Sequence, residues 1–276
     1  MIKIENISYK YSGSPSSVFD GLSLSFEEGK IYGLLGKNGV GKSTLLYLLS
    51  GLLLPGKGRI EVDGFVPSRR EPSLMENVFF VPDEFLLPNM SLARYVQFYG
   101  KFYPRFSQEI FDACLQDFEL TDVKKIGQLS LGQKKRLLVS FALATQCRVL
   151  LMDEPTNGLD IPSKAQFRQI LSRRFEERNT IIISTHQVKD VENLIDPIVI
   201  LSHNAVLLDA SVQKITEKLY FEYGGEKRDD ALYSEMLPGG YMNVIPNTTG
   251  EESQINIEAL FNAVLRNKER INDLFK

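Results

Sequence analysis

The sequence lacks tryptophan and has only two cysteines and two histidines among its 276 residues. Cys114 and Cys147 are too few and too isolated for a disulfide framework or a cysteine-rich metal cluster. Such sparse cysteine usage is typical of a reducing compartment. We therefore expect a cytoplasmic protein.

Long apolar runs are also missing. The longest uninterrupted stretches, such as residues 149–152 and 198–201, are far shorter than the roughly 20 residues of a membrane-spanning helix. Residues 1–13 alternate polar and apolar side chains and lack the pattern of a secretory signal peptide. We expect a chain that does not cross a membrane by itself.

Neither sign of charge dominates, since 32 Lys and Arg residues against 35 Asp and Glu residues leave a formal net charge of −3. Proteins that bind nucleic-acid backbones normally carry a basic surplus, so we expect no direct nucleic-acid partner. The 43% of hydrophobic residues are enough for a sizeable core. The length predicts one large domain, or one domain with an appendage.

The order of patterns along the chain is that of an α/β protein. Short strand-like runs occupy residues 2–35, and residues 90–144 change to helical periods rich in aromatic side chains. Strand signals return at residues 148–152 and 180–184, on either side of a helical stretch, as in a parallel sheet. Residues 201–208 predict a hairpin with Asn204 in its turn.

The composition changes again beyond about residue 210. Residues 224–252 predict loops around short strands, because they are rich in glycine, proline, asparagine and charge. Asn256 can cap a following helix, of which residues 257–265 place five apolar side chains on one face. We interpret residues 1–210 as the main domain and residues 211–276 as a small C-terminal appendage.

A glycine-rich loop carries the first chemical signal. The sequence GKNGVGKST at residues 36–44 matches G-x-x-x-x-G-K-[ST] between a predicted strand and a predicted helix at residues 43–54, which is the context that a phosphate-binding loop requires. Its backbone N–H groups can surround phosphate oxygens, Lys42 can reach the terminal phosphates, and Ser43 can bind Mg²⁺. The simpler interpretation, a glycine turn capped by Ser43, does not explain the context.

Two later strands end in ionisable side chains. The segment at residues 148–155 is an apolar strand-like run followed by Asp153 and Glu154. Asp153 can therefore join a Mg²⁺ shell, and Glu154 can polarise an attacking water. Alone, such a pair more often marks a solvated loop. His186 follows the run at residues 181–185 and can bond a phosphate or the water, although a lone histidine is usually an ordinary polar residue.

The sequence LSLGQ at residues 129–133 precedes a strongly helical stretch. Ser130 and Gln133 have the spacing of a capping box, with Ser130 as the N-cap. A capped helix start with Gly132 beside it is also a suitable anion site, so both interpretations hold together.

The ordered motifs GKNGVGKST, LSLGQ, LLMDEP, NGLD and STH resemble those of the ATP-binding subunit of an ABC transporter, over about residues 1–210. The resemblance implies an α/β P-loop NTPase with a mixed central sheet, an N-terminal antiparallel β subdomain, a helical insertion at about residues 84–144 and a small α+β appendage. It implies ATP and Mg²⁺ as ligands. The phosphates would be held by Gly36, Lys37, Asn38, Gly39, Val40, Gly41, Lys42, Ser43 and Thr44.

The resemblance also assigns the remaining roles. Glu154, His186 and Lys42 would be catalytic, and Ser43 and Asp153 would hold the metal. Tyr11 would stack on adenine, although it could simply pack, and Tyr9 is close by. Ser130, Gly132, Gln133 and Asp160 would meet the nucleotide of the opposite subunit. One P-loop and one signature in a chain cannot face each other across one nucleotide, so the resemblance implies a homodimer around two Mg-ATP.

Two positions depart from the family pattern. Leu131 stands where the signature usually has glycine, a substitution that we discount. After the strand at residues 77–81, Asp83 stands where the family usually has a glutamine that touches Mg²⁺. Asp83 can serve as a metal ligand, with Glu84 the next candidate and an ordinary surface acid the alternative.

The resemblance implies an ATPase on the cytoplasmic face of the cell membrane that drives a separate permease. Residues 98–107 and the appendage resemble those of ABC-2-type exporter ATPases, which favours export. A soluble ABC-type clamp acting on nucleic acid or ribosomes is the alternative, although the coiled coils and zinc modules of such proteins are not seen. A nucleotide-binding regulator with little turnover is a third possibility. No residues are recognisable as a selector of cargo.

Overall fold

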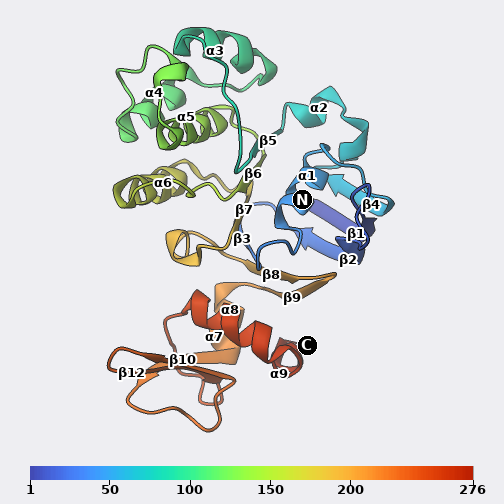
Figure 1. The fold of residues 1–276 in the computed structure, drawn as a ribbon, viewed down its shortest axis with the longest axis vertical. Helices are drawn as coiled ribbons and strands as arrows, with labels where there is room; N and C mark the ends of the chain where they lie inside the picture. Colours follow the sequence, from blue (N-terminus) through green and yellow to red (C-terminus); the bar gives the residue numbers. More distant parts are fainter. Residues whose placement is uncertain (276) are drawn as a thin grey trace.

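The computed structural model describes residues 1–275 and is organised around a six-stranded mixed sheet (Figure 1). Strands lie in the order β5-β6-β7-β3-β8-β9, in which β8 and β9 are antiparallel and the other pairs are parallel. β6 and β7 are buried along their whole length, as their continuous apolar sequences require. The bounds are β3 (Lys30–Leu35), β5 (Val78–Val81), β6 (Val149–Asp153), β7 (Thr180–Thr185), β8 (Ile198–Ser202) and β9 (Ala205–Ala210).

The register of the central strands fixes where the predicted site residues meet. Leu35 at the end of β3 pairs with Thr185 at the end of β7, and Asp153 at the end of β6 pairs with Ser184. The carboxyl ends of three neighbouring strands are therefore level. The segments that follow them leave the sheet at one edge, where ligands of parallel α/β sheets bind.

A second sheet covers the N-terminal part of the chain and confirms the predicted antiparallel β subdomain. Its strands, in the order β2-β1-β4, are all antiparallel. Helix α1 (Lys42–Leu49) contacts both β4 and β6 and so lies between the two sheets. Its buried leucines share one apolar cluster with the inner face of the antiparallel sheet. The strand bounds are β1 (Ile2–Tyr9), β2 (Phe19–Phe26) and β4 (Lys57–Val62).

Helix α1 ends earlier than its apolar sequence predicts, at Leu49 rather than at residue 54. Gly51 takes a left-handed conformation with φ of 73°. The N–H of Leu52 then donates to the carbonyl of Tyr47 at 2.9 Å, and that of Gly51 donates to Leu48 at 3.2 Å. These bonds form the Schellman termination that glycine favours. The apolar run thus continues past the helix, which made the predicted end wrong.

The predicted helical insertion is present, at the end of the molecule opposite the C-terminal appendage (Figure 1). Its aromatic side chains are core residues, since the ring of Phe141 lies 5.1 Å from that of Tyr95, 5.1 Å from that of Phe106 and 6.2 Å from that of Phe111. The helices here and just outside it are α2 (Pro72–Met75), α3 (Leu92–Tyr99), α4 (Gln108–Asp117), α5 (Leu131–Ala144) and α6 (Ile161–Arg174). Short 3₁₀ turns are η1 (Pro67–Arg69), η2 (Gly100–Phe102), η3 (Ile126–Gln128) and, after β7, η4 (Val188–Asp190).

The C-terminal segment forms an antiparallel sheet in the order β10-β12-β11, with α8 between this sheet and edge strand β9 (Figure 1). The Asn256 side chain accepts a bond from the N–H of Ala259 at 2.9 Å, so the predicted cap is confirmed. Asn204 has the left-handed conformation expected for its turn. The bounds are α7 (Val212–Lys218), β10 (Leu219–Gly224), β11 (Tyr233–Leu237), β12 (Gly240–Pro246), α8 (Ile257–Arg266) and α9 (Lys268–Phe275).

The appendage packs into the same apolar core as the central sheet, through side chains such as Leu260 and Val264. The division of the chain at residue 210 stays a prediction. Within residues 1–275, no helix is both long enough and apolar enough to span a membrane.

Candidate functional site

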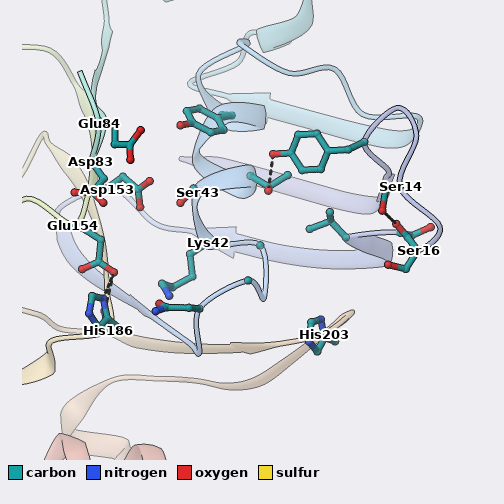
Figure 2. A pocket seen from close by; sticks show the side chains of 18 of the residues that line it. Ser14, Ser16, Lys42, Ser43, Asp83, Glu84, Asp153, Glu154, His186 and His203 are labelled. Atoms are coloured by element: carbon teal, nitrogen blue, oxygen red, sulfur yellow. Dashed lines mark hydrogen bonds and ion pairs between the residues drawn. The ribbon is translucent and has the colours of Figure 1, made fainter. Parts of the chain in front are cut away.

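A cavity of about 810 Å³ opens beside the level carboxyl ends of β3, β6 and β7 (Figure 2). Figure 2 shows Lys42 and Ser43 on one wall, facing Asp153 and Glu154 across the opening. The loop before β2 and the turn after β8 complete the walls. The lining residues are Tyr11, Ser14, Ser16, Ser17, Val18, Asn38, Gly39, Gly41, Lys42, Ser43, Thr44, Tyr47, Asp83, Glu84, Asp153, Glu154, Asn157, His186 and His203.

The glycine-rich loop between β3 and α1 has a backbone that side chains would disturb. Gly41, the N-cap position of α1, has φ of 107°, and a Cβ atom there would lie 2.7 Å from the side chains of Phe19 and Val18. At Gly36 a Cβ atom would lie 2.7 Å from Val40. With glycine as its N-cap, α1 has backbone N–H groups that no side chain of its cap satisfies, and these suit an anion.

The predicted phosphate-binding residues divide into two groups. Asn38, Gly39, Gly41, Lys42, Ser43 and Thr44 line the cavity. Gly36, Lys37 and Val40 do not line it. The carbonyls of Gly36 and Lys37 instead hold the Lys42 side chain, and Val40 is buried in the core.

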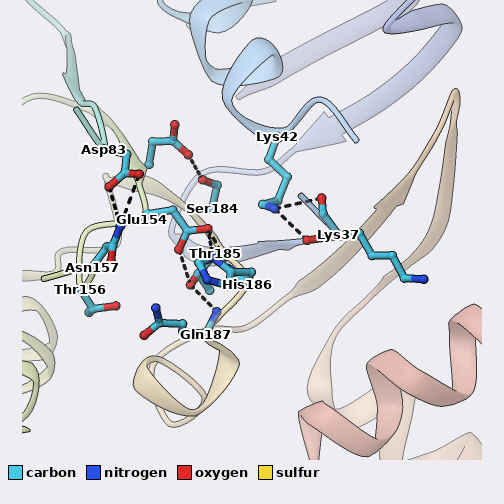
Figure 3. Close-up of polar contacts among 12 residues, drawn as sticks. Lys37, Lys42, Asp83, Glu154, Thr156, Asn157, Ser184, Thr185, His186 and Gln187 are labelled. Atoms are coloured by element: carbon cyan, nitrogen blue, oxygen red, sulfur yellow. Dashed lines mark hydrogen bonds and ion pairs between the residues drawn. The ribbon is translucent and has the colours of Figure 1, made fainter. Parts of the chain in front are cut away.

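Lys42 is buried, and its Nζ donates to the carbonyl of Gly36 at 2.7 Å and to that of Lys37 at 3.3 Å (Figure 3). An ammonium group has three donors, so one is left for a ligand in the cavity. Burial lowers the pKa of Lys42, while the charges of Glu154 and Asp153 act in the opposite direction. A bound anion would favour the charged form of this lysine.

Asp153 and Glu154 are both nearly inaccessible, at 3% and 8% exposed. The hydroxyl of Ser184 donates to Asp153 Oδ1. Glu154 Oε2 accepts from the hydroxyl of Thr185 at 2.9 Å, and Oε1 accepts from the backbone N–H of His186 at 3.0 Å (Figure 3). Glu154 also has a left-handed backbone with φ of 45°, which is uncommon outside glycine. Its carboxylate is thus held in one orientation from strand β7.

The imidazole of His186 lies against the same carboxylate, with Nδ1 2.6 Å from Glu154 Oε1. If Nδ1 carries the proton donated to Glu154, Nε2 is the ring atom left for another partner. Since the side chain is 41% exposed, a ligand can reach it. The structure therefore joins Lys42, Asp153, Glu154 and His186 in one cavity, as the sequence predicts.

The donor set suits a metal ion that is shared with a ligand. Among residues 1–275, no group of three or more His, Cys, Asp or Glu side chains is arranged to hold a metal by itself. The Ser43 hydroxyl and the Asp153 carboxylate both line the cavity. Mg²⁺ usually takes one or two such oxygens and completes its shell with water and phosphate oxygens. These residues fit Mg²⁺ held with a nucleotide.

Asp83 also lines the cavity, but two protein groups already contact it. Lys135 Nζ lies 3.4 Å from Asp83 Oδ1 and donates to the Asp83 carbonyl at 3.0 Å, and Asn157 Nδ2 donates to Oδ1 at 3.1 Å. Burial lowers the pKa of Lys135, and the charge of Asp83 opposes that shift. Asp83 is therefore more than a surface acid. Its role as a metal ligand stays a prediction, as does that of Glu84.

Sequence reasoning missed Lys135, Asn157, Thr185 and Ser184, which orient the carboxylates. It also missed His203 and the serines of residues 14–17, which line the far end of the cavity. A weak signal existed for Lys135, because it occupies an otherwise buried face of α5. The others depend on contacts between distant segments.

Of the two candidate tyrosines, Tyr11 lines the cavity and Tyr9 does not. The Tyr11 hydroxyl bonds Thr44 Oγ1 at 3.0 Å, and its ring meets the ring of Tyr9 edge-on at 5.0 Å. Tyr11 remains 40% exposed, so one surface of it is open to a ligand. Stacking on adenine stays a prediction.

The predicted signature residues lie outside this cavity. The capping box is confirmed, since Gln133 N–H donates to Ser130 Oγ at 3.2 Å and Ser130 N–H donates to Gln133 Oε1 at 2.9 Å. Gly132 packs near the carbonyl of Gly158. Asp160 caps α6 by accepting from the Ser163 N–H at 2.9 Å. Hydrogen bonding from the Ser163 side chain, and secondly from its backbone, lowers the pKa of Asp160. The chain does not bring these residues to its own cavity.

Comparison with known proteins agrees with this geometry. The family described as ABC transporter matches residues 19–157. The SkfA peptide export ATP-binding protein SkfE of Bacillus subtilis is 29% identical over 79% of this chain and 92% of its own length. The bacitracin transport ATP-binding protein BcrA of Bacillus licheniformis is 34% identical over 76% of this chain and 69% of its own.

A solved structure shares the fold. A dimeric post-hydrolysis state of an ATP-binding cassette, bound to ADP and Pi, has a TM-score of 0.68 at 24% identity and covers 77% of this chain and 99% of that chain. The family match spans the glycine-rich loop and the Asp153–Glu154 strand end, which are the walls of the cavity. This chain belongs to the ABC transporter family and is an ATP-binding protein of the ABC ATPase type.

Proposed function

We propose that this chain hydrolyses ATP as one half of a homodimer and drives export through a separate membrane permease. The observation that carries the proposal is the position of Glu154, a buried carboxylate held by Thr185 and His186 across the cavity from Lys42. A carboxylate fixed beside a phosphate-binding loop has the placement of a general base.

Each wall of the cavity has a role in this proposal. Residues 36–44 hold the phosphates through backbone N–H groups and Lys42. Ser43 and Asp153 would hold Mg²⁺, with Asp83 as a further candidate, and the ion would neutralise charge on the phosphates. Glu154 takes a proton from the attacking water, and His186 Nε2 bonds the terminal phosphate or that water. Tyr11 offers its ring to adenine.

The dimer is supported by what the cavity leaves out. Ser130, Gly132, Gln133 and Asp160 do not line it, although the family resemblance assigns them to a nucleotide. In a head-to-tail pair they would approach the nucleotide of the other chain, so that two chains complete two sites. The exposed apolar side chains of Leu131 and Ile161, beside these residues, suit burial against a second chain. A solved cassette of the same fold is dimeric.

Export through a permease is supported by the relatives. SkfE is named for peptide export and BcrA for bacitracin transport. The helical region exposes the rings of Phe98 and Phe102, and α3 with the turn after it is where a membrane partner would dock. Such a partner would hold this chain on the cytoplasmic face of the cell membrane.

Glu154→Gln tests the catalytic assignment. We expect the turnover number for Mg-ATP to fall by about 10²- to 10⁴-fold, the contribution typical of a general base, while nucleotide binding persists. Glu177→Gln, an exposed carboxylate away from the cavity, is the matched control and should leave turnover unchanged. Turnover by Glu154→Gln at the wild-type rate would contradict the assignment.

Two further readouts test the partners. Glu154→Gln at saturating Mg-ATP should run as a dimer in light scattering, and a persistent monomer would contradict the homodimer. Tagged wild-type protein, purified from gently solubilised membranes, should retain a stoichiometric multi-spanning chain. Recovery only from the soluble fraction with nucleic acid or ribosomes attached would instead support a clamp.

A further inference from the structure

The segment that follows His186 is clamped on one side by α6 and by the loop after Glu154. Asp190, the last residue of η4, lies 2.7 Å from Lys164 Nζ and accepts from the Thr156 hydroxyl at 3.0 Å. Arg168 donates to the Asp190 carbonyl at 3.0 Å. These bonds tie η4 to the catalytic side of the molecule.

The other side of η4 meets α8 of the appendage. Lys189 Nζ lies 2.7 Å from a carboxylate oxygen of Glu258. Phe261, one turn further along α8, lines a second cavity of about 220 Å³ together with Val188 and His186. The same cavity is lined by Leu35 at the end of β3, by Gly36, Lys37 and Asn38 at the start of the phosphate-binding loop, and by Thr185. Phe261 of the appendage therefore shares one cavity with both the phosphate-binding loop and His186.

Helix α8 is firmly anchored, so it can act as a support. Ile257, Leu260, Ala263 and Val264 are fully buried and fix it to the appendage sheet and the central core. Phe261 lies outside this set and is only partly buried. Phe261 lines the smaller cavity beside η4, whereas the fully buried side chains anchor the helix.

We propose that α8 positions His186 for ATP hydrolysis, through Phe261, which lines one cavity with Val188 and His186, and through Glu258, which pairs with Lys189. The inference rests on the proposed function and gives the appendage a part in it. Because η4 is a single short turn, its place depends on what holds it from each side. Phe261 and Glu258 are positioning residues, and neither touches the reacting atoms.

The Lys189–Glu258 ion pair and the Phe261 side chain should contribute unequally to the position of η4. The side chains of Lys189 and Glu258 are 77% and 51% exposed, and exposed ion pairs contribute little. The aromatic side chain of Phe261 is one wall of the cavity that Val188 and His186 also line, and truncation to alanine would enlarge that cavity. Phe261 is therefore the residue to change.

The test uses Phe261→Ala in the full chain, with Phe261→Leu as the conservative variant. We expect the turnover number of Phe261→Ala to fall about tenfold, equivalent to a small displacement of one catalytic group, with KM for ATP unchanged. Phe261→Leu should restore most of the turnover. Met236→Ser, an exposed position of the appendage sheet, is the control and should behave as wild type.

Two readouts separate positioning from general destabilisation. Amide hydrogen exchange should become faster in residues 186–191 of Phe261→Ala and stay unchanged in α1. In a His186→Ala background, Phe261→Ala should lower turnover no further, because both changes then act on the same group.

Unchanged turnover in Phe261→Ala, a further loss in the His186→Ala background, or faster exchange throughout the chain would each overturn the inference. If the wild-type protein fails to hydrolyse ATP with its permease present, the proposed function fails instead. The exchange measurement on residues 186–191 then decides the α8 contact by itself.

Discussion

The nucleotide cavity and the C-terminal appendage attach to different parts of one central sheet and use their residues differently. The cavity lies at the carboxyl ends of β3, β6 and β7, where its walls contain buried charges and glycines with left-handed backbones. The appendage packs on edge strand β9, and the inner face of α8 is entirely apolar. In the cavity, residue identity at fixed spacing determines the chemistry. In the appendage, shape and volume determine where a helix lies.

This contrast predicts that neighbouring glycines of the phosphate-binding loop differ sharply. Gly41→Ala combines a left-handed backbone with a Cβ atom 2.7 Å from Phe19 and Val18. We expect it to lower the free energy of unfolding by about 2–5 kcal/mol, from backbone strain together with overpacking. Gly39 has a similar backbone, with φ of 81°, but nothing lies within 4 Å of its Cβ position.

Gly39→Ala is thus the matched control and should lower the free energy of unfolding by about 1–2 kcal/mol, from the backbone alone. Urea unfolding of both variants without nucleotide measures the difference. Equal losses would mean that the loop relaxes around the added methyl group, and that its shape is less fixed than the contacts indicate.

In the same loop, Lys42→Met should remove nucleotide binding without lowering the stability of the nucleotide-free protein. Burial lowers the pKa of Lys42, so the folded state disfavours its charge. Removing that charge should leave the protein without nucleotide at least as stable as wild type. Stabilisation by Mg-ATP, about 2.7 kcal/mol for wild type at a ligand concentration one hundred times Kd, should disappear. Thermal unfolding with and without Mg-ATP measures both effects.

The lowered pKa of Lys42 also predicts how the free energy of unfolding depends on pH. A lysine with a lowered folded pKa binds fewer protons when folded than when unfolded, so wild-type stability should rise as the pH climbs from the folded pKa toward the ordinary value of 10.5. This rise should be absent from Lys42→Met. A Lys42→Met protein that is less stable than wild type without nucleotide would show that the bonds to Gly36 and Lys37 outweigh the burial.

What the sequence predicts and what it misses follow the same division. The phosphate-binding loop, the Asp153–Glu154 strand end and the caps at Ser130 and Asn256 are local signals, and each lies where predicted. The Lys135–Asp83 pair joins residues 52 positions apart, and α8 meets η4 from nearly seventy residues away. The hydrophobic periodicity of a sequence carries no information about contacts between such distant residues. They become visible only when the sheet order brings the segments together.

The smallest expected effect compares one helix cap from each region. Ser130 and Asn256 both accept a backbone N–H at the start of a helix. Ser130→Ala and Asn256→Ala should each lower the free energy of unfolding by about 1 kcal/mol, as lost N-caps do. Equal losses in urea unfolding would show that the two caps are equivalent as local structure.

Their effects on turnover should differ. Under the proposed dimer, Ser130 also bonds the nucleotide of the opposite chain, and a lost bond to a charged phosphate lowers turnover by roughly 10- to 100-fold. Asn256→Ala loosens the first turn of α8, but Phe261 lies more than a turn beyond the cap, so turnover should stay within about twofold of wild type. If both variants lost turnover equally, the cap at Ser130 would act on activity only through helix stability, and the signature would have no direct contact with the nucleotide.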